Sequence, residues 1–322
     1  MICVTCMSPA ESLFTRYSED HIQLTDCNVC HNTVDRYVEI DNVVLFIDLL
    51  LLKPGAYRHL VFNSLEETLS KYDDWKPLNL SAIHKHPRGT LRRLRDNLRN
   101  WMFKYDMINR MWILLLTFEV YLRCISEETK YSKLINEYGA PHLASSAIFL
   151  NTSLGMIHKW GSLYQSIYYF FYSTLDILIF HNLTQYIFMS WYRWQPDNKY
   201  ASSIISYTIL LSYGAKIFPV LMLIWPYDTL LTMDIIKQVA NLYIIEALRI
   251  VTGMSYFTIL RVFLFVTVIR VLVVKYLMNL VVTNGNLNLS LLNLCFELQL
   301  MVPGGVKKLL MEFAQRVLGS LS

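Results

Sequence analysis

Four cysteines near the start of the sequence form its clearest chemical pattern. Cys3, Cys6, Cys27 and Cys30 make two C-x2-C pairs separated by twenty residues. Each pair can turn two sulfurs toward one ion, and two pairs complete a tetrahedron with zinc–sulfur distances of about 2.3 Å. Four thiolates leave no position for a water molecule, so the pattern predicts a structural Zn²⁺ site and not a catalytic one.

Other chemistry is compatible with the same cysteines. Disulfides would need an oxidising compartment, but residues 1–12 lack both the basic and the apolar region of a signal peptide. We therefore expect the N-terminus to stay in the reducing cytosol. Residues 27–31 also match the C-x-x-C-H pattern of haem attachment, which would leave the first cysteine pair unexplained. His21 and His31 are additional candidate ligands, and surface histidines are the simpler interpretation of both.

Short strands must position the two cysteine pairs. Residues 13–18 and 21–25 surround a polar turn and are expected to form two strands, and the alternating residues 34–40 fit a third. Together they predict a zinc ribbon over residues 1–40. A module of that size is too small for a good core without its metal.

A helical segment is expected after the ribbon, over residues 41–83. Residues 43–52 are apolar except for Asp48 and are too short to span a membrane, which predicts a buried or interfacial helix. Pro54 suits the first turn of a second helix. The apolar residues of that helix are spaced along one face, and they are Tyr57, Leu60, Val61 and Leu65.

The segment DNVVLFIDLLLLKPGAYRHLVFN, residues 41–63, makes the N-terminal pattern more specific than its cysteines alone. Together with ICVTC, HIQLTDC and VDRYVE in the ribbon, it resembles the homology domain of the Arv family. The resemblance implies a fungal member of that family and covers about the first 63 residues. Beyond them, only the type of sequence agrees.

The family resemblance also implies a function. It indicates an endoplasmic reticulum and Golgi membrane protein of sterol trafficking and distribution, sphingolipid metabolism and glycosylphosphatidylinositol (GPI) precursor handling. Its partners would be membrane lipids and endoplasmic reticulum membrane enzymes. The alternative is a scaffold or accessory subunit of a GPI biosynthetic enzyme.

Neither catalysis nor nucleic acid binding is indicated by the rest of the sequence. It contains no nucleophile motif, phosphate-binding loop, dinucleotide fingerprint or H-E-x-x-H motif, so we expect no enzyme. A membrane transferase that uses Asp176 or His181 is the remaining alternative, and their five-residue spacing, which puts them on different helix faces, gives it little support. The net charge of +4 is too small to suggest a nucleic acid partner.

Basic residues lead into the more apolar part of the chain. Residues 84–106 contain seven Lys or Arg against two Asp, with leucines near helical spacing and Trp101 close behind them. We expect a basic juxtamembrane helix, which favours the cytosolic side and could lie on an anionic membrane surface.

The remaining residues, 107–322, are predicted to form a multi-span membrane region, and the fold class is a mainly α, polytopic helical membrane protein. Residues 136–322 hold only 12 Lys/Arg and 8 Asp/Glu. The strong candidate spans lack nearly all charges, and the weaker candidates contain several, each costing about 2.5–3.5 kcal/mol at a helix centre. The strong candidates are 166–190 and 202–225, and the weaker ones are 107–125 and 256–281.

Polar residues inside the candidate spans are where a lipid site would be sought. Asp176, His181 and Lys216 are the candidates, and His181 shares a helical seam with Thr174 and Gln185. The alternative that we favour is interhelical hydrogen bonding that fixes packing.

The charge distribution predicts a topology. Residues 1–104 would be cytosolic, 126–165 lumenal, 191–201 cytosolic, 226–255 lumenal, and the C-terminus cytosolic again. Asn151 begins a glycosylation motif in the first lumenal loop, and Asn79 begins one on the cytosolic side.

Overall fold

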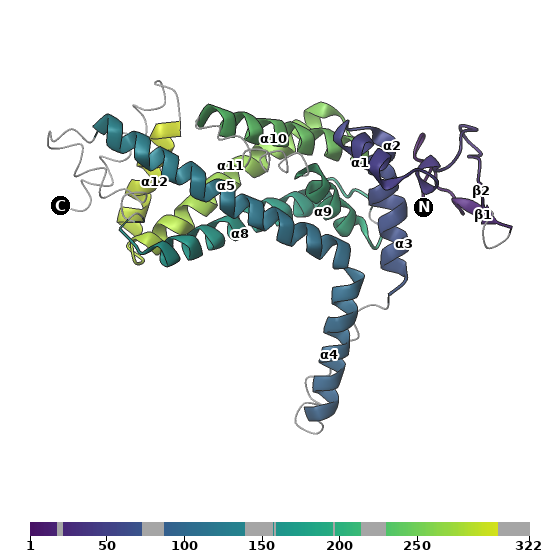
Figure 1. The fold of residues 1–322 in the computed structure, drawn as a ribbon, viewed down its shortest axis with the longest axis horizontal. Coiled ribbons are helices and arrows are strands. Elements are labelled where there is room, and N and C mark those ends of the chain that lie inside the picture. The colour runs from purple at the N-terminus through teal and green to yellow at the C-terminus, as the bar shows by residue number, and fades with distance from the viewer. Residues whose placement is uncertain are drawn as a thin grey trace. The chain divides into compact units, whose positions relative to one another are not determined.

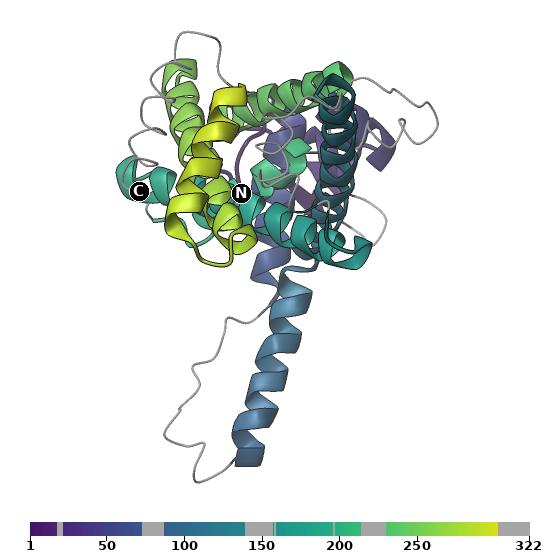
Figure 2. The ribbon, with the colours of Figure 1, turned by 90° about the vertical axis from the view of Figure 1, so that its left-hand side faces the viewer.

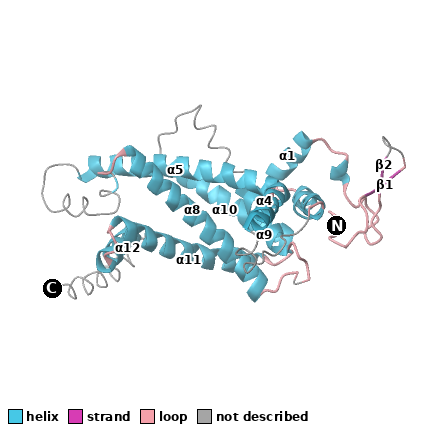
Figure 3. Ribbon diagram, turned by 90° about the horizontal axis from the view of Figure 1, so that it is seen from below, coloured by secondary structure: helices cyan, strands magenta, loops and turns pink. Residues whose placement is uncertain are grey.

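The protein is mainly helical, and the predicted α class is confirmed. In the part of the chain that the computed structural model describes, two short strands near the N-terminus accompany a series of helices (Figures 1 and 3). The described residues are 1–17, 22–72, 87–138, 157, 159–195, 197–213 and 230–301.

The chain folds into two compact units, each formed by segments that are distant in sequence. The first unit contains Met1–Leu115, Gln185–Pro226 and Ile235–Leu260. The second contains Leu116–Thr184, Tyr227–Asp234 and Arg261–Ser322. The N-terminal cysteines therefore belong to the same unit as helices that follow them by about 200 residues.

A small ribbon begins the first unit. Strand β1 (Phe14–Arg16) pairs antiparallel with β2 (Ile22–Leu24), which confirms the two predicted strands. Single bridges between Ile2 and Pro9 and between Asp26 and Thr33 extend the pairing. A minimal core of buried side chains lies beneath, made of Cys3, Leu13, Cys27 and Val34.

The predicted third strand over residues 34–40 is wrong. The chain turns instead into a short 3-10 helix, η1 (Arg36–Val38). The cause is the buried Asp35, whose carboxylate accepts a hydrogen bond from the Tyr37 amide at 3.0 Å. A local side-chain acceptor of this kind competes with strand pairing.

Helix α1 (Asn42–Leu50) forms where the apolar run predicted a short helix. Its orientation is unexpected, because Asp48 is its buried residue, whereas Val43, Phe46 and Leu51 are 62%, 50% and 64% exposed. An exposed apolar face of this size fits the interfacial alternative.

A continuous helix follows, formed by α2 (Pro54–Arg58), the π-helical η2 (His59–Ser64) and α3 (Leu65–Ser70). Pro54 occupies its first turn, as predicted. The predicted apolar face is buried at Tyr57, Val61 and Leu65.

The predicted basic helix is α4 (Pro87–Lys104), and α5 (Asp106–Tyr138) follows it directly. In Figure 2, α4 extends away from the other helices of the first unit. Lys104, at its end, is buried against Tyr72 and Tyr200.

The remaining helices supply most of the apolar surface. They are α8 (Ser162–Tyr186) with its π-helical continuation η4 (Ile187–Trp191), α9 (Ala201–Ser212), α10 (Leu230–Thr252), α11 (Tyr256–Val282) and α12 (Leu287–Met301).

The ranking of the candidate spans differs from the sequence prediction. Among the described residues, α11 is the one helix that is long and apolar enough to cross a membrane, although the sequence ranked 256–281 as weak. The span expected at 166–190 is helical, but its tyrosine, serine and glutamine side chains make it less apolar. Only the first half of 202–225 lies among the described residues.

Contacts within the first unit bring parts of residues 226–255, predicted to be lumenal, next to segments predicted to be cytosolic. The Tyr243 hydroxyl donates to the Leu50 carbonyl at 2.8 Å, and the Trp194 indole donates to the Thr252 carbonyl at 3.2 Å. Leu50 and Trp194 were both expected on the cytosolic side. The charge rule biases orientation only weakly and does not detect packing between distant segments, so the membrane topology stays a prediction.

Helices α8 and α11 run antiparallel within the second unit. Phe180 contacts Phe263 with ring centroids 6.0 Å apart, whereas Tyr168, earlier in α8, packs with Val274 and Met278, later in α11. The two helices are therefore aligned over most of their length.

Candidate metal centre

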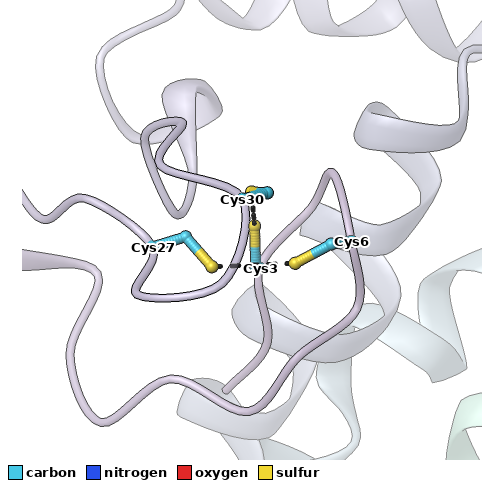
Figure 4. Close-up of side chains that lie close together, drawn as sticks. All are labelled: Cys3, Cys6, Cys27 and Cys30. Carbon is cyan, nitrogen blue, oxygen red and sulfur yellow. Dashed lines mark hydrogen bonds between the residues drawn. The ribbon is translucent and has the colours of Figure 1, made fainter.

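The four predicted cysteines converge in the ribbon (Figure 4). The sulfurs of Cys3 and Cys30 are 3.7 Å apart, and those of Cys6 and Cys27 are 3.6 Å apart. All four sulfurs lie within 4.8 Å of one another. The sequence spacing thus predicted a cluster that the fold does assemble.

Two turns of the same geometry present the sulfurs. In the first turn, the Cys3 amide donates to the Ser8 carbonyl at 2.9 Å. In the second turn, the equivalent bond runs from the Cys27 amide to the Asn32 carbonyl at 2.8 Å, and its donor and its acceptor each lie 24 positions later in the sequence.

The residue that follows each pair also has the same conformation. Met7 and His31 take positive φ values of 64° and 58°, in the left-handed region that glycine usually fills. A left-handed residue lets the chain curl back around its two sulfurs. Sequence reasoning missed these positions because neither of them is a glycine.

The arrangement fits a tetrahedral zinc ion. A zinc–sulfur distance of about 2.3 Å places the sulfurs of a tetrahedron about 3.8 Å apart. The two sulfur–sulfur distances of 3.6 and 3.7 Å match that value and exceed the disulfide length of about 2.05 Å. His31 is exposed and outside the cluster, and His21 lies outside the described residues.

The Ser8 hydroxyl contacts two of the four sulfurs and lowers the pKa of a thiol. It lies 3.0 Å from the Cys6 sulfur and 3.2 Å from the Cys27 sulfur. Hydrogen bonding from Ser8, then from the backbone at Cys30 and Val29, lowers the pKa of Cys27 to about 6. The ligand set therefore contains a thiol that is readily deprotonated, the form that binds metal.

Arg58 supports the first cysteine turn from the helix behind it. Its guanidinium Nη1 donates to the carbonyls of Val4 and Thr5, at 2.9 and 2.8 Å. Burial lowers the pKa of Arg58, and the nearby Cys3 and Cys6 oppose that shift. The positive charge is therefore well placed to offset a negatively charged thiolate cluster.

Asn63 clamps the start of the chain. Its side chain, fully buried, accepts from the Ile2 amide at 2.8 Å and donates to the Ile2 carbonyl at 3.0 Å. It also donates to the buried Asp35 carboxylate at 2.7 Å, which His59 contacts at 2.7 Å. One polar network thus joins the ribbon to η2.

A second polar contact joins the ribbon to α1. The buried Asp48 carboxylate accepts from Lys53 at 2.6 Å and from the Tyr37 hydroxyl at 3.0 Å. Lys53 first, then Tyr37 and Arg36, hold the pKa of Asp48 below its usual range. Tyr37 also packs on Gly55, where an added Cβ would lie 2.9 Å from its ring.

These contacts give a structural role to the polar residues and the glycine of the segment KPGAYRHLVFN, residues 53–63. Lys53, Gly55, Arg58, His59 and Asn63 each contact the ribbon or its connection to α1. The available sequence signal was the presence of polar side chains on an otherwise apolar helix. It could not reveal their partners, which lie up to 61 positions away.

Asp176 lies in an ion-pair network of the second unit. Arg123 donates to its carboxylate at 3.2 Å, and Arg270 lies 3.3 Å from its other oxygen. The Arg123 guanidinium also lies 3.9 Å from the centre of the Tyr172 ring. Neither arginine was predicted as a site residue, although both lie in the candidate spans that their charges ranked as weak.

The other lipid-site candidates are His181, which the structure describes, and Lys216. His181 is buried on the face of α8 that also carries Ile177 and Thr184. Gln185 donates to the Ser202 carbonyl at 3.2 Å. Lys216 lies outside the described residues.

Comparisons with known proteins agree with the N-terminal resemblance and extend it. A profile of the Arv1-like family matches residues 2–248. Protein ARV1 of Saccharomyces cerevisiae is 50% identical over 89% of this chain and 92% of its own. The proteins of the same name from Eremothecium gossypii and Candida albicans are 46% and 31% identical, covering 89% and 88% of this chain and 91% and 90% of their own.

No solved structure matches the chain. The family assignment therefore rests on sequence, and it agrees with the two cysteine turns and the helix that clamps them. With a profile match across most of its length and relatives that align over nearly all of it, the chain belongs to the Arv1-like family.

Proposed function

We propose that the protein is a multi-span membrane protein of the endoplasmic reticulum and Golgi that mediates sterol and lipid homeostasis. Its role would be sterol trafficking and distribution, with effects on sphingolipid metabolism and GPI-precursor handling. The observation that carries this is family membership across residues 2–248, because the resemblance associates the family with these lipids. The role is non-enzymatic.

The membrane location is supported by the hydropathy of α11 and by the apolar face that α1 exposes. The cytosolic side of the N-terminus is supported by the arginines of α4. The ion pairs of Asp176 with Arg123 and Arg270 hold α5, α8 and α11 together. A lipid path through these helices would depend on those ion pairs. His181 and Lys216 are the other candidate residues for such a path.

The metal in this proposal is a structural Zn²⁺ held by Cys3, Cys6, Cys27 and Cys30. When bound, it would fix the ribbon, which has too small a core to stand alone. Arg58 and Asn63 would then transmit a fixed ribbon geometry to the helix that supports it.

A lipid-transfer assay tests the function. The protein is purified in mild detergent, its bound lipids and proteins are identified by mass spectrometry, and it is reconstituted into donor vesicles containing fluorescent sterol. We expect it to accelerate sterol transfer to acceptor vesicles, and Cys27→Ala to abolish this while Cys124→Ala, outside the cluster, does not. No acceleration, combined with a co-purifying enzyme that loses activity when the protein is removed, would establish an accessory subunit instead.

A further inference from the structure

An apolar groove runs along α4 and onto the first turns of α5, within the first unit. Its volume is about 750 Å³. The lining residues with apolar side chains are Leu91, Leu94, Leu98, Met102, Phe103 and Ile113.

The groove lies on one face of α4 and faces outward. Leu91, Leu98 and Met102 follow helical spacing and are 69%, 45% and 61% exposed. The face that packs inward is a different one, marked by the buried Asn97 and Lys104. An apolar face left open beside a packed one indicates a binding surface.

The border of the groove is positively charged. Arg95, Arg99 and Arg110 line it with a single acidic residue, Asp106. Asp106 is paired with Arg110 at 2.8 Å. Among the described residues, Arg95 forms an ion pair with the exposed Asp96 at 3.7 Å, which solvent and salt weaken. The border therefore has two positive charges in excess, on the side chains of Arg95 and Arg99.

We propose that this groove binds an anionic phospholipid of the bilayer surface. The acyl chain occupies the apolar floor, and the phosphate is held by Arg95 and Arg99, whose planar guanidinium groups suit two-pronged contacts to phosphate oxygens. The charge excess favours this occupant over a zwitterionic lipid or an uncharged sterol. The inference goes beyond the proposed function, because it does not depend on which lipid the protein moves.

The expected contribution of each arginine is measurable. A basic residue near an anionic membrane surface contributes about 1 kcal/mol, which corresponds to roughly fivefold in affinity. Loss of both arginines is therefore expected to reduce occupancy of the groove by about tenfold or more.

Photocrosslinking with the full-length protein tests the proposal. The protein is reconstituted into phosphatidylcholine vesicles that contain a trace of phosphatidylserine or phosphatidylcholine bearing a diazirine on its acyl chain. After irradiation, adducts are mapped by mass spectrometry. We expect the phosphatidylserine probe to label peptides covering residues 91–113 at least fivefold more strongly than the phosphatidylcholine probe.

Two variants make the test specific. Arg95→Gln with Arg99→Gln should reduce that labelling by about tenfold, whereas Arg93→Gln, an exposed arginine of α4 outside the groove, should leave it within about twofold. All the substituted side chains are exposed, so the thermal unfolding temperature should not change.

Three results would overturn the proposal. Equal labelling by the two probes would show an unselective apolar surface. Unchanged labelling of the double variant, or an equal loss in Arg93→Gln, would show that the groove arginines have no special role. Crosslinks from the groove to a protein in place of the lipid would assign the surface to a protein partner.

Discussion

A single asparagine side chain pairs with the backbone of Ile2 in the way that a neighbouring strand would. Asn63 bonds both backbone groups of Ile2 and the Asp35 carboxylate. Without it, the Ile2 amide and carbonyl would lose this partner, whereas Asp35 would keep its contacts with Tyr37 and His59. Buried polar groups without partners cost about 1–3 kcal/mol each. The geometry of the ribbon therefore depends on the helix that carries Asn63 as well as on the cysteine cluster.

The first prediction concerns the cysteines. Purified protein should contain one zinc per chain, and Cys27→Ala should lose it because three thiolates cannot complete the tetrahedron. Cys124→Ala is the control, since its thiol is outside the cluster. Metal analysis provides the measurement, and zinc-free wild-type protein or haem absorbance would refute the assignment.

Gly55 is the second test at this scale. An alanine there would place its methyl group 2.9 Å from the Tyr37 ring, which is buried and hydrogen-bonded to Asp48 and cannot easily move. We expect Gly55→Ala to lower the free energy of unfolding by about 1–3 kcal/mol. Gly161→Ala, whose nearest contact would be an ordinary 3.9 Å, should change it little in the same thermal unfolding experiment.

At the scale of elements, ion pairing lowers the cost of placing the charged residues of α11 in a membrane. Three cations in this helix make it a poor span when each is counted alone. Arg270 lies beside Asp176, and Lys275 donates to Glu297 at 2.7 Å. Paired charges lose much of their insertion cost, so the helix can be both apolar and charged.

Asp176 provides the prediction for this scale. Asp176→Ala would leave Arg123 and Arg270 facing each other without the carboxylate, and should destabilise the protein by on the order of 3 kcal/mol. If the residue serves packing, adding Arg270→Met should recover part of the loss in thermal unfolding, with bound lipid unchanged. Loss of bound lipid at unchanged stability would instead favour the lipid-site interpretation.

At the scale of the whole molecule, the cysteine module is part of a larger unit. Phe62 contacts Trp194 with ring centroids 6.4 Å apart, and Tyr243 reaches the end of α1. Residues predicted to lie on opposite sides of a membrane are therefore neighbours. These contacts predict a topology that keeps α10 on the side of the ribbon and leaves the sequence prediction for residues 126–165 unchanged.

This topology is testable by labelling. With the ribbon in the cytosol, a cysteine placed at the exposed Gln238 should react with an impermeant maleimide from the same side as one placed at Glu11. Reaction from the opposite side would restore the lumenal position of residues 226–255 and argue against the packing of Tyr243 on α1.

Glycosylation provides an independent reporter. Asn151 lies in a segment expected to be lumenal in both topologies, so a glycosidase-sensitive mass shift should disappear in Asn151→Gln and persist in Asn79→Gln. Modification at Asn79 would invert the orientation of the whole chain.

The sequence alone determined the cysteine cluster, the ribbon strands, the helix beginning at Pro54 and the basic helix. Each depends on local spacing, because two cysteines on one turn or a proline in a first helical turn act over a few residues. Only the tertiary structure decided the roles of Asp35, Arg58 and Asn63, the burial of Asp48, and the packing of α10 against α1. Those features depend on contacts between segments up to 193 positions apart, such as Tyr243 with Leu50, and local patterns of hydrophobicity and charge do not encode which distant backbone group a side chain will meet.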